Sequence, residues 1–257
     1  MSAGVRSLLS HSPVFAGRSF KRFIRSPDNV VSTVGFPLLL LLTILAVFSS
    51  AVEGFDEGPY AQRLVPMLVV SGLMFGSLST AVGFFTDLGQ GYMQRIRTMP
   101  VSPAGPLVGA VLGEIGRAAV ALAVLVAVGY GFEFRFTNGI VPAIGFCLMA
   151  MLASVSIVWI GLAMATVARS QEALGPPLGS LFLVLLFFSR GMVPIDAYPG
   201  WAQPVVRFNP ATAYVTAMDH LARGGDLVKP ILGSLAWSAG LVAVFGTIAV
   251  RAIRRAK

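Results

Sequence analysis

The stretch IVPAIGFCLMAMLASVSIVWIGLAMATVA, residues 140–168, contains no charged side chain. About 20 consecutive apolar residues are enough for an α-helix to cross the hydrocarbon core of a bilayer. The stretch therefore predicts a membrane-spanning helix, and its extra length would let the helix tilt or extend past the bilayer. This assigns the chain to the integral membrane proteins, because a helix that is apolar all round belongs in a protein core or a membrane.

Similar apolar runs recur along the chain on both sides of this stretch. The predicted spans are residues 30–50, 64–86, 106–130, 140–168, 174–193 and 230–250. The composition agrees, because 12% of the residues are charged and a soluble domain carries about twice that fraction. We therefore predict an all-α integral membrane protein with six transmembrane helices and both termini on one side.

The basic residues indicate which side of the membrane each loop occupies. Residues 1–29, the loop 87–105 with the start of the third span, the loop 169–173 and the tail 251–257 carry thirteen of the 19 Lys and Arg, against four of the 11 Asp and Glu. Cytoplasmic loops carry an excess of Lys and Arg, so both termini are predicted to be cytoplasmic. The net charge of +8 then reflects topology, and no nucleic-acid partner is expected.

Residues 1–29 include an amphipathic segment ahead of the first span. At 100° per residue, Phe20 and Phe23 fall on one face, and Lys21, Arg22 and Arg25 fall on the opposite face. Such a helix lies in the membrane interface, with its cations among anionic lipid headgroups. It is either a plain positive-inside anchor or an elbow helix that also touches a cytoplasmic partner, and the two roles are compatible.

The loop 87–105 is longer than a connector between two spans requires. A bare connector needs only a few residues, whereas this loop holds a short amphipathic segment that ends at Pro100. The polar and apolar residues of the segment are Tyr92, Gln94, Arg95, Ile96 and Arg97. A short cytoplasmic helix of this composition suits docking into a groove on another protein, and a plain connector is the alternative.

The order of residues in this loop resembles the first cytoplasmic loop of ABC-2 type permeases. The matching residues are Asp87, Gly91, Arg95, Ile96, Arg97, Thr98, Met99, Pro100, Val101 and Ser102. The resemblance is closest to the daunorubicin and doxorubicin resistance branch of drug-export permeases. In that family the loop is the coupling helix that transmits ATPase movement, so the resemblance implies an ATPase-coupling site. That site would comprise Asp87, Gly91, Tyr92, Gln94, Arg95, Ile96, Arg97 and Pro100.

The segment 194–229 before the last span is too long for a tight turn. Asn209-Pro210 is a helix start, with Asn as the N-cap and Pro at the first helical position, and Gly224-Gly225 is a stop. We predict a re-entrant or surface helical hairpin on the outer face, with Trp201 at the membrane interface. Pro194, Trp201, Asn209 and Pro210 also resemble the ABC-2 signature region ahead of the last span.

Glu114 and Arg117 are the charged residues that fall within the third span. Their spacing of three places them on one face of a helix, and intramembrane charges usually face a partner or a cavity. One interpretation is an ion pair that snorkels to the headgroups. The other is a coupling pair that contacts the loop 87–105 and carries motion into the bundle.

An ATP site of the P-loop type is absent from the sequence. Such a site needs a lysine directly after a glycine, and none of Lys21, Lys229 and Lys257 has one before it. ATP and Mg²⁺ are therefore expected on a separate ATPase chain. The single cysteine, Cys147, excludes a disulfide within one chain, and no metal site or catalytic residue is expected.

Together these features predict the membrane subunit of an ATP-driven ABC exporter, which is not itself an enzyme. By the resemblance it would sit in a bacterial plasma membrane with a second permease and export a drug or a lipid. Export of a polysaccharide or a glycolipid is an alternative, because some family members carry these. An intramembrane enzyme or a secondary transporter is disfavoured, since no catalytic cluster or inverted repeat appears. The transmembrane domain is expected over residues 30–250, and the substrate-lining residues are not specified.

Overall fold

The computed structural model describes residues 60–89, 105–191 and 193–255, together with positions 35, 39 and 43. The amphipathic segment of residues 1–29, most of the predicted first span and most of the loop 87–105 lie outside these residues. The long helices are α4 (Tyr60–Gly89), α6 (Gly105–Gly131), α7 (Ile140–Val167) and α11 (Val228–Arg255). The shorter ones are α8 (Gly175–Phe187), η2 (Ile195–Ala197), α9 (Gln203–Arg207) and α10 (Pro210–Arg223). The described part of the chain contains helices and no strand.

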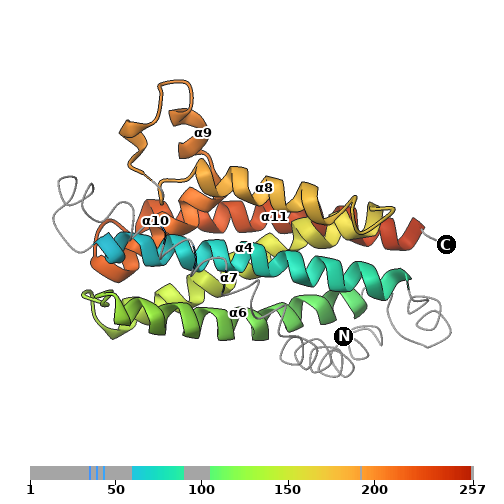
Figure 1. Cartoon of the computed structure of the whole chain (residues 1–257), viewed down its shortest axis with the longest axis horizontal. Coiled ribbons are helices and arrows are strands. Elements are labelled where there is room, and N and C mark those ends of the chain that lie inside the picture. The colour runs from blue at the N-terminus through green and yellow to red at the C-terminus, as the bar shows by residue number, and fades with distance from the viewer. Residues whose placement is uncertain are drawn as a thin grey trace.

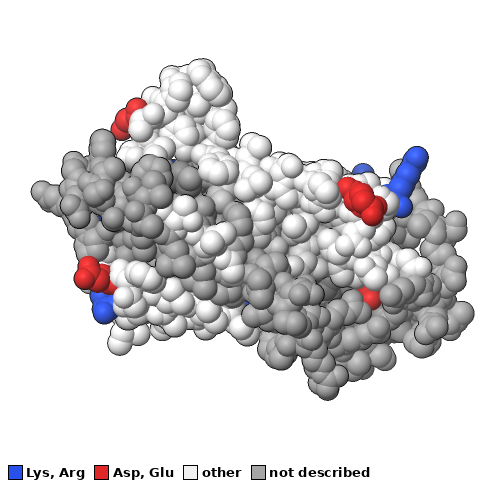
Figure 2. Space-filling model, in the orientation of Figure 1, with Lys and Arg blue, Asp and Glu red and all other residues white. Residues whose placement is uncertain are grey.

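The long helices lie side by side in an elongated bundle, in which α4, α7 and α11 run in one direction and α6 runs in the opposite direction (Figure 1). The described parts of α4, α6, α7 and α11 are each long and apolar enough to cross a membrane, so four of the predicted spans are confirmed as long apolar helices. The end of α4, the start of α6, the turn between α7 and α8 and the end of α11 share one end of the bundle. On the face shown in Figure 2, charged side chains of the described residues lie toward the two ends of the long axis.

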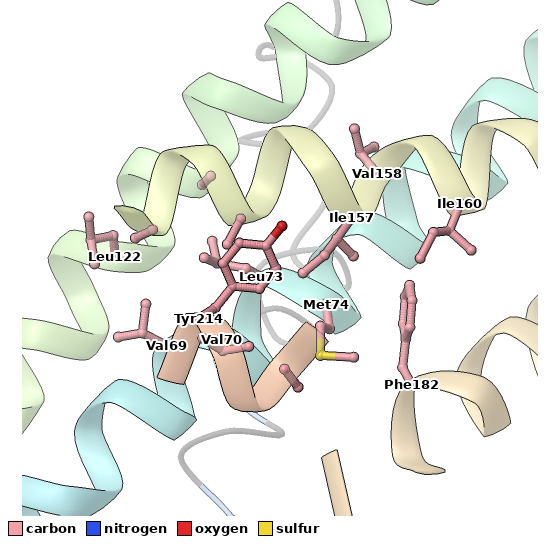
Figure 3. Packing of buried hydrophobic residues seen from close by; sticks show 14 of the residues in the cluster. Val69, Val70, Leu73, Met74, Leu122, Ile157, Val158, Ile160, Phe182 and Tyr214 are labelled. Carbon is pink, nitrogen blue, oxygen red and sulfur yellow. The ribbon is translucent and has the colours of Figure 1, made fainter. Parts of the chain in front are cut away.

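The core is built around α7, which packs against α4, α6, α10 and α11. Figure 3 shows apolar side chains of α4, α6, α7, α8 and α10 meeting there. Leu73 of α4, Ile157 of α7 and Tyr214 of α10 are almost completely buried in this cluster. Lipid tails are as apolar as these side chains, so the helices associate through close packing and hydrogen bonds rather than through the hydrophobic effect.

Small residues let α4 and α7 approach closely. A Cβ atom on Gly161 would lie 2.7 Å from Ala81 Cβ and 3.2 Å from Leu178 Cδ2. Both distances are shorter than ordinary carbon contacts, and Ala81 Cβ is fixed to its backbone. The crossing of α4, α7 and α8 therefore depends on the absence of a side chain at this position.

Replacing Gly161 with alanine is expected to destabilise the bundle by about 1 to 3 kcal/mol, the usual cost of overpacking a tight core. The check is the thermal unfolding midpoint of the purified protein in detergent. Gly179→Ala is the matched control, because its added Cβ would lie 4.0 Å from the nearest atom, Leu78 Cδ2. If both variants unfold at the same temperature, the stability of the bundle does not depend on the close approach of α4, α7 and α8 at Gly161.

The predicted fifth span, residues 174–193, is only partly helical, and this prediction of a full-length span was wrong. Helix α8 has 13 residues and ends at Phe187, so it is about 20 Å long, whereas the hydrocarbon core is about 30 Å thick. Beyond it the chain turns at residues 188–191 and continues into η2 and α9. Apolar composition alone did not reveal where this helix ends.

Candidate functional site

Side chains from residues 194–229, called the outer segment after their predicted position, satisfy the carbonyl groups at the C-terminal end of α8. The last carbonyl groups of a helix have no partner within the helix, and in a membrane they must be satisfied by protein. Asn209 Nδ2 donates to Leu185 O at 2.7 Å and to Phe188 O at 2.6 Å. The Tyr198 hydroxyl lies 2.7 Å from Phe187 O and 3.0 Å from Ser189 O.

Asn209 also begins α10, as the sequence predicted. Its side-chain oxygen accepts a hydrogen bond from Ala211 N at 2.8 Å, and Pro210 is the first helical residue. The predicted stop is also confirmed, because α10 ends at Arg223 and Gly224 follows with φ 98°, a conformation that glycine adopts without strain. One amide side chain, 4% exposed, therefore caps the start of α10 and the end of α8.

Helix α10 is held inside the bundle rather than lying on its surface. It packs against α4, α7 and α11, and its residues Tyr214, Val215, Met218 and Leu221 are buried. The Tyr214 hydroxyl lies 2.8 Å from Ser238 Oγ on α11, which satisfies both polar groups in the core. The outer segment is thus tied to α8 through Asn209 and to α11 through Tyr214.

A buried ion pair lies between α4, α6 and α7. Glu114 is 0% exposed and Arg117 is 3% exposed, and both belong to α6. Arg117 Nε donates to Glu114 Oε2 at 2.9 Å, and Arg117 Nη2 donates to Glu114 Oε1. The carboxylate also accepts from Thr80 Oγ1 of α4 at 2.6 Å and from Ser154 Oγ of α7 at 2.7 Å. Its oxygens therefore accept hydrogen bonds from all three helices.

Gly76 of α4 makes room for the arginine. A Cβ atom at this position would overlap the Arg117 guanidinium, so the guanidinium lies directly against the α4 backbone. Its Nη2 also lies 3.5 Å from Leu73 O of the same helix. We call the set Glu114, Arg117, Thr80, Ser154 and Gly76 the Glu114 network.

The snorkelling interpretation of this pair was wrong. Glu114 lies about 14 Å along the axis from the start of α6 at ~1.5 Å per residue. This depth is close to half of a hydrocarbon core about 30 Å thick, and the exposures above leave no path to headgroups. The pair faces inward because Thr80 and Ser154 offer it hydroxyl donors there, and a buried charge needs such partners.

The family model described as ABC-2 type transporter matches residues 14–221 of this chain. The chain belongs to the ABC-2 type transporter family. The match includes the loop 87–105, the Glu114 network and the helix start at Asn209. The resemblance recognised in the loop and in the outer segment is thereby confirmed at the level of the family.

This ABC-2 permease is similar over nearly its whole length to permeases named for drug resistance. It is 30% identical over 258 residues to the daunorubicin resistance ABC transporter permease protein DrrB1 of Streptomyces coeruleorubidus, with 99% of this chain and 91% of that protein covered. It is 27% identical over 256 residues to the probable doxorubicin resistance ABC transporter permease protein DrrC of Mycobacterium tuberculosis, with 98% and 91% covered. The doxorubicin resistance permease protein DrrB of the same species is 25% identical over 208 residues, with 78% and 71% covered.

The structure places only part of the predicted coupling site of the permease. Asp87 lies in the last turn of α4, and the other predicted coupling residues, Gly91 to Pro100, lie outside the described residues, as do Phe20 to Arg25. In the outer segment Pro194 precedes η2, and Trp201 is 71% exposed. The coupling role of these residues stays a prediction.

Two further features bear on the chemistry of the permease. Within the described ranges, no group of three His, Cys, Asp or Glu side chains could hold a metal ion. In the turn between α7 and α8, hydrogen bonds from its own backbone amide and from Ser170 lower the pKa of the Glu172 carboxyl. Glu172 therefore keeps its negative charge near neutral pH, at the end of the bundle where α4 ends.

Proposed function

We propose that this permease is the membrane subunit of an ATP-driven exporter in a bacterial plasma membrane. It moves a hydrophobic or amphipathic compound, a drug or a lipid, out of the cell. A separate cytoplasmic P-loop ATPase binds ATP and Mg²⁺, and a second permease completes the transport path. Both termini and the loop 87–105 face the cytoplasm, and the segment 194–229 faces outward.

The observation that carries this proposal is the near full-length relationship to the two permeases whose names record daunorubicin and doxorubicin resistance. A match over 98–99% of this chain includes the loop, the bundle and the outer segment together. Daunorubicin and doxorubicin are planar, largely apolar compounds with one amine, so an apolar or amphipathic substrate suits these names. On the face shown in Figure 2, the charged side chains of the described residues lie toward the ends of the bundle, which also fits such a substrate. The missing P-loop lysine supports a separate motor chain.

The bundle supports a division of labour along its long axis. The loop 87–105 connects α4 to α6 at one end, where a motor chain would push on both helices. The outer segment is tied to α8 and α11 at the other end through Asn209 and Tyr214. Alternating access would then open a path between two permeases when ATP closes the motor domains.

ATP-dependent uptake into inverted membrane vesicles tests this function directly. The vesicles contain the permease and the ATPase that co-purifies with it, and the probes are doxorubicin and a fluorescent short-chain phospholipid. We expect uptake of at least one probe with ATP, none with a non-hydrolysable analogue, and inhibition by vanadate. Vesicles that take up neither probe, with the complex intact and hydrolysing ATP, would contradict the proposed substrate class.

Reversing the charge of Arg95 and Arg97 together to glutamate is expected to weaken binding of the ATPase. Each arginine contributes to a docking surface, and truncating one partner of a close charge pair costs about 2 to 5 kcal/mol at an interface. The measurement is the amount of ATPase that co-purifies with the tagged permease. Arg169→Glu is the matched control, an exposed arginine in a different loop at the same end. Equal recovery from all three proteins would argue against docking by this loop.

A further inference from the structure

The Glu114 network joins the two helices that flank the loop 87–105 to the central helix of the bundle. Thr80 lies on α4, which leads into the loop, Glu114 and Arg117 lie on α6, which leaves it, and Ser154 lies on α7. Most of the loop lies outside the described residues, so the direct loop contact that the sequence suggested for the pair stays a prediction.

The network sits at the same depth on both flanking helices. Thr80 lies about 14 Å before the end of α4 and Glu114 lies about 14 Å after the start of α6, at ~1.5 Å per residue. In an antiparallel pair, this places them level with each other. A displacement of the loop would move the end of α4 and the start of α6. The network joins these two helices by hydrogen bonds farther along their length.

Selection for stability alone would not require a buried ion pair at this position. Replacing both members of a buried ion pair with apolar side chains of similar volume is often neutral or stabilising, whereas removing only one member is strongly destabilising. Here the pair is almost fully buried, and its oxygens accept from three helices in one arrangement. Such a fully satisfied polar network fixes a unique geometry between helices, which apolar contacts do not.

We propose that the Glu114 network is a positioning element that makes α4, α6 and α7 move as one body. A movement of the loop then displaces α7 together with α4 and α6, the helices on either side of the loop. Because α7 packs against α10 and α11, the displacement reaches the outer segment. Gly76 belongs to the element because only a residue without a side chain lets the guanidinium lie against α4. This inference rests on the proposed function and assigns coupling, rather than stability, to the network.

Two variants separate coupling from stability. Glu114→Leu with Arg117→Met removes both charges and fills their volume. Thr80→Val with Ser154→Ala keeps the ion pair within α6 but cuts its hydroxyl ties to α4 and α7. The second variant removes a few atoms only, so it decides the question if the first fails to fold. Gly179→Ala, at an uncrowded position, is the control.

Each variant is measured in three ways: thermal unfolding of the purified permease, ATP hydrolysis by its complex, and uptake of doxorubicin or the fluorescent phospholipid per ATP in inverted vesicles. We expect both variants to assemble, to unfold within a few degrees of the native protein, and to hydrolyse ATP. Uptake per ATP should fall about tenfold, within the 5- to 150-fold range of typical coupling between sites. Gly179→Ala should match the native protein.

The outcomes distinguish this inference from the proposed function. Native uptake per ATP in both variants would overturn the coupling role and leave the exporter function standing. Loss of ATPase assembly in Thr80→Val with Ser154→Ala would also overturn it, because the network would then act on complex formation. Absence of uptake by the native permease would remove the proposed function, and the inference would fall with it.

Discussion

Replacing Arg117 alone with methionine is expected to cost the folded permease about 3 to 5 kcal/mol, the usual penalty for leaving a buried charge without its partner. Glu114 would keep its hydrogen bonds from Thr80 and Ser154 but would lose the guanidinium that pairs with it inside the bundle. For a chain of this size the thermal midpoint should fall by about 6 to 20 °C. The measurement is thermal unfolding in detergent, together with the yield of inserted protein.

The matched comparison for Arg117→Met is the apolar pair Glu114→Leu with Arg117→Met. Glu114→Leu removes the carboxylate that Arg117→Met leaves without a partner, so the thermal midpoint should return to near the native value. Two substitutions that are together less harmful than one are the signature of direct coupling between the two sites. If Arg117→Met unfolds at the native temperature, Glu114 and Arg117 do not form the pair described.

The second large effect is expected at Asn209. Asn209→Ala removes the N-cap of α10, worth about 1 kcal/mol. It also leaves Leu185 O and Phe188 O at the end of α8 without their amide donor. Each buried carbonyl left without a hydrogen-bond partner costs about 1 to 3 kcal/mol, so together with the cap the total loss should be about 3 to 7 kcal/mol. Thermal unfolding in detergent measures it.

Asn209→Asp separates the two roles of the side chain. Aspartate retains the acceptor for Ala211 N and is as good an N-cap as asparagine, but it has no amide hydrogens for α8. If the tie to α8 matters, the aspartate variant should lose most of the stability that the alanine variant loses, and its export should fall as well. A native-like aspartate variant together with a destabilised alanine variant would show that only the N-cap matters.

The sequence predicted features that depend on neighbouring residues. The start of α10 at Asn209-Pro210 and its end before Gly224 were confirmed, because capping is set by residues within one turn. The spans at residues 64–86, 106–130, 140–168 and 230–250 were also confirmed as helices, because a long, largely apolar run has few alternatives in lipid.

Features that depend on distant contacts were missed. Helix α8 ends at Phe187 inside the predicted span of residues 174–193, and the groups that complete its end come from Tyr198 and Asn209. The role of Gly76 likewise depends on a guanidinium from another helix. No periodicity in the sequence records such a pairing.

The direction in which Glu114 and Arg117 face could not be decided from their spacing. Residues three apart share a face of the helix whether that face meets lipid or protein. The inward direction depends on Thr80 and Ser154, two hydroxyl side chains on other helices. A hydroxyl on each of two neighbouring predicted spans, at a similar depth to an intramembrane acid, is the signal that could have indicated the network.

Whether this permease works with a separate motor chain is tested by isolating the tagged protein in mild detergent and identifying its partners. We expect a stoichiometric soluble P-loop ATPase and vanadate-sensitive ATP hydrolysis by the complex. A pure preparation with neither partner nor hydrolysis, reproduced in several detergents and in native nanodiscs, would contradict it.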